Sequence, residues 1–157
     1  MTQYSFSIAE ANQQYIRFRV DFEAAPENAL IHLPRWRPGR YELGNFAKNV
    51  RNFRVFDENG KLCPIAKEGS SSWRVVNNPG AHLRVEYGYF AADLNAGSTY
   101  LSIEQLYVNP VNCCIYLAER MEDECQLTLD IPDEWNVATS LKREGKKLFA
   151  KDRKSVV

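Results

Sequence analysis

Apolar and polar residues alternate regularly along three stretches of the chain. These stretches are residues 3–8, 15–22 and 125–131. In the second of them, Ile16, Phe18, Val20 and Phe22 alternate with charged residues. A period of two is typical of a β-strand that buries one face and exposes the other to water. The pattern therefore predicts three half-buried strands.

Further apolar stretches, separated by turn-forming residues, predict additional strands. We expect them at residues 51–56, 61–66, 73–76, 82–90, 111–118, 135–141 and 147–150. Residues 57–60 contain Asn-Gly and residues 77–80 contain Pro-Gly. Both pairs favour the positive φ angles of tight turns, so each predicts a hairpin between its flanking strands.

The connections between these strands are short, and the chain shows no long amphipathic helical stretch and no internal repeat. The sequence predicts an all-β fold, an antiparallel β-sandwich of roughly 8–10 strands with little helix. We expect a single β-sandwich domain over residues 1–150 and a terminal tail at residues 151–157. Residues 92–109 are weakly periodic and mix polar with aromatic side chains, so they are expected to form a loop at the rim of the sandwich.

Composition and charge narrow the function classes. The chain has 157 residues, the size of one domain, and its 20 basic and 20 acidic side chains cancel. The N-terminus lacks a basic region followed by an apolar run, and no stretch reaches the roughly 18 apolar residues that span a bilayer. We expect a cytoplasmic protein with no nucleic-acid and no membrane partner, and an oligomer is possible.

Few residues offer catalytic chemistry. The two histidines, His32 and His82, lie fifty residues apart, and no His-Glu-x-x-His helix accompanies them. No CxxC spacing occurs among the four cysteines, which we expect to be free and buried. They are Cys63, Cys113, Cys114 and Cys125. The sequence also lacks a nucleophile elbow, a P-loop and a Rossmann glycine motif, so we predict no catalytic residue and no metal site in this chain.

Residues 35–54 are strongly basic within a neutral chain. One acidic residue, Glu42, stands among six basic ones, which are Arg35, Arg37, Arg40, Lys48, Arg51 and Arg54. Aromatic residues between them could stack on the bases of a single-stranded nucleic acid. Arginines that alternate along a strand are more typical of a solvated face. In that interpretation Trp36 anchors the core, and Pro38 and Gly39 form a type II turn.

Several motifs follow one another in a fixed order. Residues 34–41 read Pro-Arg-Trp-Arg-Pro-Gly-Arg-Tyr, residues 46–50 read Phe-Ala-Lys-Asn-Val, and residues 131–141 read Ile-Pro-Asp-Glu-Trp-Asn-Val-Ala-Thr-Ser-Leu. Together with the Trp73 strand and residues 87–109, they resemble the N-terminal domain of the glycyl aminopeptidase family of zinc metallopeptidases. By this resemblance the structural motif residues are Trp36, Pro38, Gly39, Tyr41, Trp73 and Trp135.

The resemblance implies a parent protein that is a zinc-dependent aminopeptidase, a hydrolase that removes N-terminal Gly or Ala from peptides. Zinc is expected in a catalytic domain of the same parent chain, because no zinc ligand of the family can be placed on this sequence. This chain alone is expected to be inactive and to line the substrate cleft. The candidates for that rim are Glu104 and Gln105, which would hold the amine of the peptide, and Tyr100 and Asn109, which would fix the loop.

A second hypothesis is a stand-alone β-sandwich module that binds a peptide, a sugar or an anion. It would use Trp36, Tyr41 and the arginine-rich segment as its site. A contiguous exposed apolar face would favour a domain that docks on another domain, whereas a polar surface with one concave site would favour the independent module.

Overall fold

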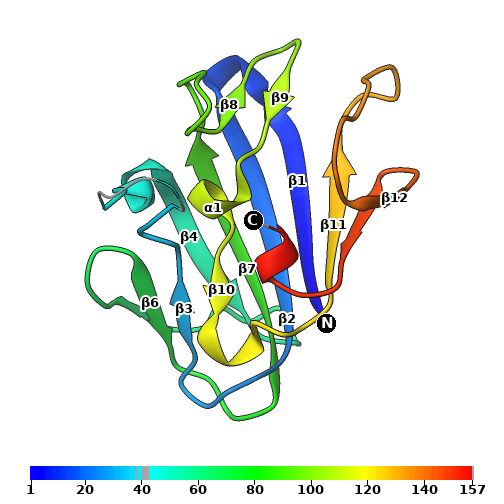
Figure 1. Cartoon of the computed structure of the whole chain (residues 1–157). Coiled ribbons are helices and arrows are strands. Elements are labelled where there is room, and N and C mark those ends of the chain that lie inside the picture. The colour runs from blue at the N-terminus through cyan, green and yellow to red at the C-terminus, as the bar shows by residue number, and fades with distance from the viewer. Residues whose placement is uncertain (38, 40–42, 157) are drawn as a thin grey trace.

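The computed structural model describes residues 1–37, 39 and 43–156, and its strands form three sheets (Figure 1). The seven-stranded sheet has the order β12 (Lys142–Glu144), β13 (Lys147–Ala150), β11 (Cys125–Asp130), β1 (Thr2–Glu10), β2 (Tyr15–Ala25), β7 (Ala81–Phe90) and β4 (Val50–Phe56). The four-stranded sheet has the order β10 (Tyr116–Leu117), β3 (Leu30–His32), β6 (Ser72–Val75) and β5 (Ile65–Lys67). The two-stranded sheet consists of β8 (Tyr100–Leu101) and β9 (Leu106–Tyr107).

Helical segments in the described part of the chain are short. They are η1 (Ala11–Gln13), η2 (Phe46–Asn49), α1 (Pro110–Cys113), η3 (Ala118–Arg120) and η4 (Lys154–Val156). None of the helices in residues 1–37, 39 and 43–156 is long and apolar enough to cross a membrane. The prediction of an all-β, sandwich-like fold with little helix is confirmed.

Strands β2 and β7 form the middle of the large sheet and pair antiparallel along most of their length. Phe18 and Val20 of β2 are buried, while Arg17 and Arg19 between them face solvent, as the alternation predicts. Strand β1 pairs antiparallel with β2 on one side and parallel with β11 on the other. The β1–β11 pair is thus an exception to the predicted antiparallel arrangement.

Aromatic side chains fill the core between the large and the small sheet. Phe53 of β4 stacks on Trp73 of β6 with ring centroids 4.2 Å apart, which joins the two sheets directly. The hydroxyl of Tyr4 donates a hydrogen bond to the carbonyl of Ile115 at 2.9 Å. Each such bond satisfies a polar group that would otherwise be buried without a partner. The core therefore has fixed polar contacts as well as apolar packing.

The two predicted hairpins are wrong in their pairing. Strand β4 pairs with β7 in the large sheet, and β5 pairs with β6 in the small one, so residues 51–66 cross from one layer to the other. The chain folds back as a hairpin only next to the turn, where Phe56 forms a bridge with Leu62 and the N–H of Cys63 donates to the carbonyl of Val55 at 2.8 Å. The predicted partners β6 and β7 likewise lie in different sheets. The turns themselves are present, since Gly60 and Gly80 both adopt positive φ angles.

Two other predicted strands, residues 111–118 and 135–141, do not form as expected. Residues 111–118 begin with the helix α1, which has Pro110 in its first turn, and only Tyr116–Leu117 form a strand. Proline suits the first turn of a helix because its missing N–H has no partner to lose there. Residues 135–141 form no strand, although Trp135, Val137 and Leu141 pack against the core from an irregular segment.

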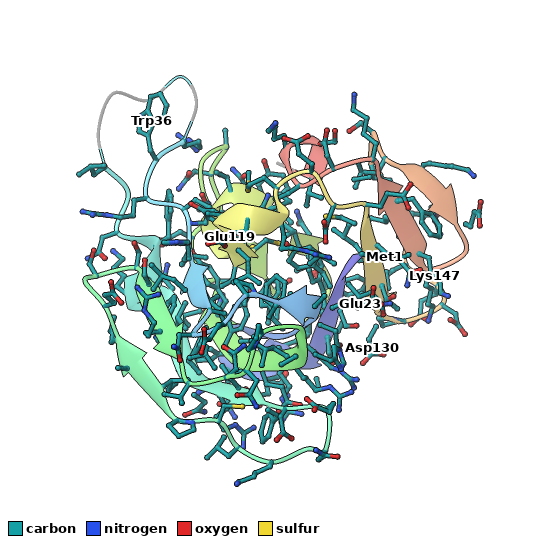
Figure 2. The ribbon with its side chains drawn as sticks, turned by 90° about the horizontal axis from the view of Figure 1, so that it is seen from below. Met1, Glu23, Trp36, Glu119, Asp130 and Lys147 are labelled. Carbon is teal, nitrogen blue, oxygen red and sulfur yellow. The ribbon has the colours of Figure 1, made fainter. Side chains whose placement is uncertain are left out.

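The motif residues have different environments. Trp73 is buried, and Trp135 is half-buried against the core. Trp36 is 54% exposed on a loop that extends away from the sheets (Figure 2), so the prediction that it anchors the core is wrong. Gly39 has a φ of 80°, which agrees with the predicted type II turn. Pro38 and Tyr41 lie outside the described residues.

The C-terminal segment packs onto the sandwich, although residues 151–157 were predicted to be a tail. Arg153 is 3% exposed and donates from Nη2 to the carbonyl of Cys114 at 2.9 Å. Val156 is buried and belongs to the hydrophobic core cluster. Within the described residues, η4 therefore covers part of the core beside α1 (Figure 1).

Candidate functional site at the loop end of the sandwich

A small hairpin forms one end of the molecule, beyond the ends of β1 and β7 (Figure 1). It consists of β8 and β9, and we call it the rim hairpin. At its turn the N–H of Ser102 donates to the carbonyl of Gln105 at 2.8 Å. The Ser102 hydroxyl accepts hydrogen bonds from the N–H groups of Glu104 and Gln105 at 3.2 and 3.1 Å. The backbone of the turn is thus held in place, and both long side chains are exposed.

The other two predicted rim residues lie at the base of this hairpin. Tyr100 pairs with Tyr107 across the two strands and also forms a bridge with Ala92. The N–H of Asn109 donates to Oγ1 of Thr99 at 3.1 Å. These contacts attach the hairpin to the end of β7, so residues 92–109 form an ordered rim rather than an irregular loop.

A cavity of about 400 Å³ lies beside the base of the rim hairpin, and we call it the rim pocket. Its walls come from parts of the chain far apart in the sequence, Arg37 with residues 43–49, and residues 89–112. Arg37 lies directly over Gly97, where an added Cβ atom would come within 1.9 Å of Nη1. A larger residue at this position would displace the end of the Arg37 side chain, so Gly97 permits the present position of the guanidinium.

Asn112 supplies a buried polar group at the bottom of the rim pocket. Its side chain is 1% exposed, and Nδ2 donates to the carbonyl of Gly97 at 2.8 Å. Oδ1 has no hydrogen-bond partner among the groups that the structure describes. A buried acceptor without a donor is costly, so this oxygen favours a ligand or a water that brings an N–H or O–H group.

The edge of the rim pocket is mostly basic. Arg37 and Lys48 contribute positive charge and Asp93 one negative charge. Asn49 Nδ2 donates to the hydroxyl of Tyr89 at 3.1 Å, and burial raises the pKa of Tyr89 well above its usual value, so this phenol stays neutral. Basic groups at the edge and an acceptor at the bottom suit the carboxylate and amide groups of a peptide.

Exposed apolar side chains gather at this end of the sandwich. Leu43, Leu94 and Ile103 are 69%, 60% and 66% exposed, and Phe90 and Tyr107 are exposed to a smaller extent. Leu43 and Phe90 line the rim pocket, and Ile103 lies next to Glu104 at the hairpin turn. Scattered apolar residues are ordinary on a surface, but several around one concave site are typical of a surface that another domain or ligand covers.

Neither histidine belongs to this end of the molecule. A nitrogen of the His32 ring lies 2.9 Å from the hydroxyl of Ser72 in the small sheet. His82 lies at the start of β7, with Nε2 3.2 Å from a carboxylate oxygen of Asp21. No group of three or more His, Cys, Asp or Glu side chains that could hold a metal occurs in residues 1–37, 39 and 43–156. The described residues therefore do not fit a zinc ion, and we derive no chemical step through one.

The four cysteines are free and buried. Burial raises the pKa of the Cys113 thiol well above its usual value and that of Cys125 to about 11. A thiol is nucleophilic only as the thiolate, so we expect these groups to be unreactive in the folded chain.

Thiol titration with an aromatic disulfide reagent measures this directly. At about pH 7.5 the native chain should react over hours, and the chain in guanidinium chloride should react at all four thiols within minutes. Rapid modification of one thiol in the native chain would contradict the prediction and identify an accessible thiolate.

None of the four predicted rim residues lines the rim pocket, whereas two basic residues of the arginine-rich segment do. Arg37 and Lys48 reach the rim pocket, whereas Arg51 and Arg54 lie on strand β4 and face the outside of the large sheet. Asn112 was not predicted at all. The available signal in the sequence was an asparagine inside an apolar stretch, because asparagine is mostly exposed in proteins and a buried one needs hydrogen-bond partners.

Comparisons with known proteins identify a family and a shared fold. The sequence profile of the Peptidase M61 N-terminal domain matches residues 3–154. No curated protein matches the chain significantly. Among solved structures, an aminopeptidase N family protein from Idiomarina loihiensis is similar, with a TM-score of 0.91 and 22% identity over 99% of this chain. This likeness shows the fold, and the chain spans 28% of the length of that protein.

A second solved structure is more distant. It is an M1 zinc metallopeptidase from Deinococcus radiodurans bound to a Tyr-Ser-Ala substrate. The match covers 94% of this chain and 37% of that one, with 14% identity and a TM-score of 0.44. Such a low score supports no statement about this chain.

Proposed function

The chain belongs to the Peptidase M61 N-terminal domain family, and we propose that it is the non-catalytic β-domain of a zinc metallo-aminopeptidase. In this proposal a catalytic domain in the same parent chain supplies the zinc and the reacting groups. The β-domain packs against it and lines one side of the cleft that receives the N-terminal Gly or Ala of a peptide. We place the protein in the cytoplasm.

The observation that carries the proposal is the family match over residues 3–154. The end of the sandwich with the rim hairpin agrees with it. Exposed apolar residues such as Leu43 and Phe90 line a concave site there, as expected of a surface that docks on another domain.

We further propose that the tip of the rim hairpin holds the free amine of the substrate. An ammonium group that leaves water needs a carboxylate or an amide oxygen nearby. Glu104 and Gln105 are exposed on a turn whose backbone is fixed by Ser102. The side chains can therefore reach outward toward a docked domain without loss of the turn.

The first experiment is to read the coding DNA past the codon for Val157. An in-frame continuation with His-Glu-x-x-His and a downstream Glu would support the proposal and supply the longer enzyme for kinetics. A stop codon at this position would contradict it and favour the stand-alone module that binds a peptide, a sugar or an anion.

In the longer enzyme, Glu104→Ala should lower kcat/KM for glycyl and alanyl amides by about 10- to 100-fold, because a charge-assisted hydrogen bond to the substrate is lost. Gln105→Ala, measured in the same assay, shows whether Glu104 or Gln105 contributes more to kcat/KM. Glu58→Ala is the matched control, since Glu58 is exposed on a turn between β4 and β5. The present chain with added zinc gives the baseline and should show no turnover.

If neither hairpin variant differs from the Glu58→Ala control, the amine-binding role is wrong, although the docking role stands. Chelator-sensitive hydrolysis by the present chain alone would overturn the non-catalytic assignment.

A further inference from the structure

The outer face of the seven-stranded sheet carries four arginines that come from two distant parts of the sequence. Arg17 and Arg19 lie on β2, and Arg51 and Arg54 lie on β4. Strand β7 runs between them, with Gly88 aligned to both Arg17 and Arg51, and Glu86 aligned to both Arg19 and Arg54. We call these four residues the arginine face. One strand therefore separates Arg17 from Arg51 and Arg19 from Arg54, which places the Cα atoms of each pair roughly 10 Å apart.

A β-bulge in β4 brings Arg51 and Arg54 to the same side of the sheet. Arg51 aligns with Gly88 and Arg54 with Glu86, so the register shifts by one residue between them. Asn52 lies at the bulge and has a φ of 52°, a left-handed conformation that is uncommon for residues other than glycine. Without the bulge, Arg54 would point toward the core. Strained backbone of this kind is concentrated at functional sites, and here its effect is to add a second arginine to the outer face.

A cavity of about 480 Å³ lies on this face. Its floor is made of small residues, Ser5 and Ser7 on β1 and Gly88 on β7. An added Cβ atom at Gly88 would lie 3.1 Å from Cγ and Nε of Arg51, so the glycine lets Arg51 lie flat across the sheet. The Arg51 guanidinium also stacks on the ring of Tyr15 at 3.3 Å from the centroid. The arginine is therefore held over the hollow rather than free in solvent.

Carboxylates pair with these arginines but use only part of their hydrogen-bonding capacity. Glu10 accepts from Arg17 at 2.7 Å and also contacts Arg51, while Glu86 accepts from Arg54 at 3.2 Å. Arg19 donates to Asp21 at 3.0 Å. Hydrogen bonds, first that from Arg17, lower the pKa of Glu10, so this carboxylate stays charged at neutral pH.

The charges on and beside the lining balance. Four arginines line the cavity together with the carboxylates of Glu10, Glu86 and Asp130, and Asp21, the partner of Arg19, lies beside it. A guanidinium has five N–H donors, and in the described contacts each of these arginines gives one of them to a carboxylate.

From this arrangement we propose that the arginine face binds a single oxyanion group, a phosphate or a carboxylate, on a small molecule. The remaining guanidinium donors from both sides of β7 would bind its oxygens, and the hydroxyls of Ser5 and Ser7 would donate from the floor. Planar guanidinium groups suit oxyanions because they offer two parallel N–H bonds. The site is on the face of the large sheet, so it does not depend on the proposed docking of a catalytic domain at the rim.

The test uses the present chain and two probes, inorganic phosphate and acetate, titrated at constant low ionic strength. Backbone amide NMR signals of β2, β7 and β4 should shift and saturate, with a dissociation constant of about 1 mM or lower. The double variant Arg17→Gln, Arg54→Gln should weaken binding at least about tenfold. These two side chains are 61% and 57% exposed, so the variant should keep its fold, which its thermal melting curve verifies.

Arg74→Gln is the matched control. Arg74 donates to Glu68 from Nε and Nη2 in the small sheet, away from the arginine face, and its removal should leave the titration unchanged. Saturation by phosphate alone would identify a phosphate group, and saturation by both probes would identify any oxyanion, including a carboxylate. No saturation by either probe, or equal binding by the double variant and the unsubstituted chain, would overturn the proposal. The arginine face would then be a network of ion pairs without a ligand.

Discussion

Trp73→Ala is expected to lower the free energy of unfolding by about 3–5 kcal/mol, the usual loss for a large buried aromatic residue. Trp73 is 5% exposed and stacks on Phe53 with the ring planes 8° apart. Phe53 belongs to the large sheet and Trp73 to the small one, so the substitution opens a cavity where the two layers meet. For a domain of this size, such a loss is a large fraction of the total stability.

Urea unfolding followed by circular dichroism measures this change, and Trp36→Ala is the matched control. Both tryptophans belong to the motifs that resemble the glycyl aminopeptidase family, but more than half of Trp36 is exposed. Its removal should cost about 1 kcal/mol or less. Equal losses for the two variants would contradict the assignment of Trp73 as the contact that joins the sheets.

Arg153→Ala is expected to destabilise the chain by about 2–4 kcal/mol. The substitution removes the donor to the Cys114 carbonyl and leaves space beside Tyr116, whose ring centroid lies 5.6 Å from the guanidinium. A buried guanidinium also has a desolvation cost, and in the described residues its Nε has no hydrogen-bond partner. The loss of packing and of the hydrogen bond should outweigh the relief of that cost.

Arg153→Met separates these contributions, because methionine fills similar space without a charge. We expect Met to cost less than Ala in the same unfolding assay. Lys154→Ala is the control, since Lys154 pairs with Glu122 on the surface and its removal should leave stability nearly unchanged. If Arg153→Ala behaves like the control, residues after 150 contribute little, and the boundary predicted from the sequence would stand.

The alternation of apolar and polar residues was a reliable guide to individual strands but not to their partners. Phe18 and Val20 are buried as their period of two predicts, and the turn at Gly60 has the expected positive φ. The hairpin inferred from that turn nevertheless extends only to Cys63, because β4 and β5 enter different sheets. A turn sequence fixes the local direction of the chain, whereas strand pairing depends on which layer offers a free edge and a complementary apolar face.

The candidate site shows the same limit. Glu104 and Gln105 lie at the tip of the rim hairpin and Tyr100 and Asn109 at its base, and their roles stay predictions. The rim pocket beside them could not be predicted. Its walls are formed by Arg37 with residues 43–49 and by residues 89–112, and nothing local in either part of the chain indicates that they meet.

By itself, the sequence determined six of the seven strands of the large sheet, that the fold is all-β, and that no local motif for metal binding or nucleophilic catalysis is present, because these depend on patterns within a few residues. The tertiary structure alone decided that Trp73 is buried while Trp36 is exposed, that Arg153 is buried, and that a bulge at Asn52 places Arg54 beside Arg51 on the outer face of the large sheet. These outcomes depend on contacts between segments far apart in the chain. The periodicity of one segment does not predict the free energy of such contacts.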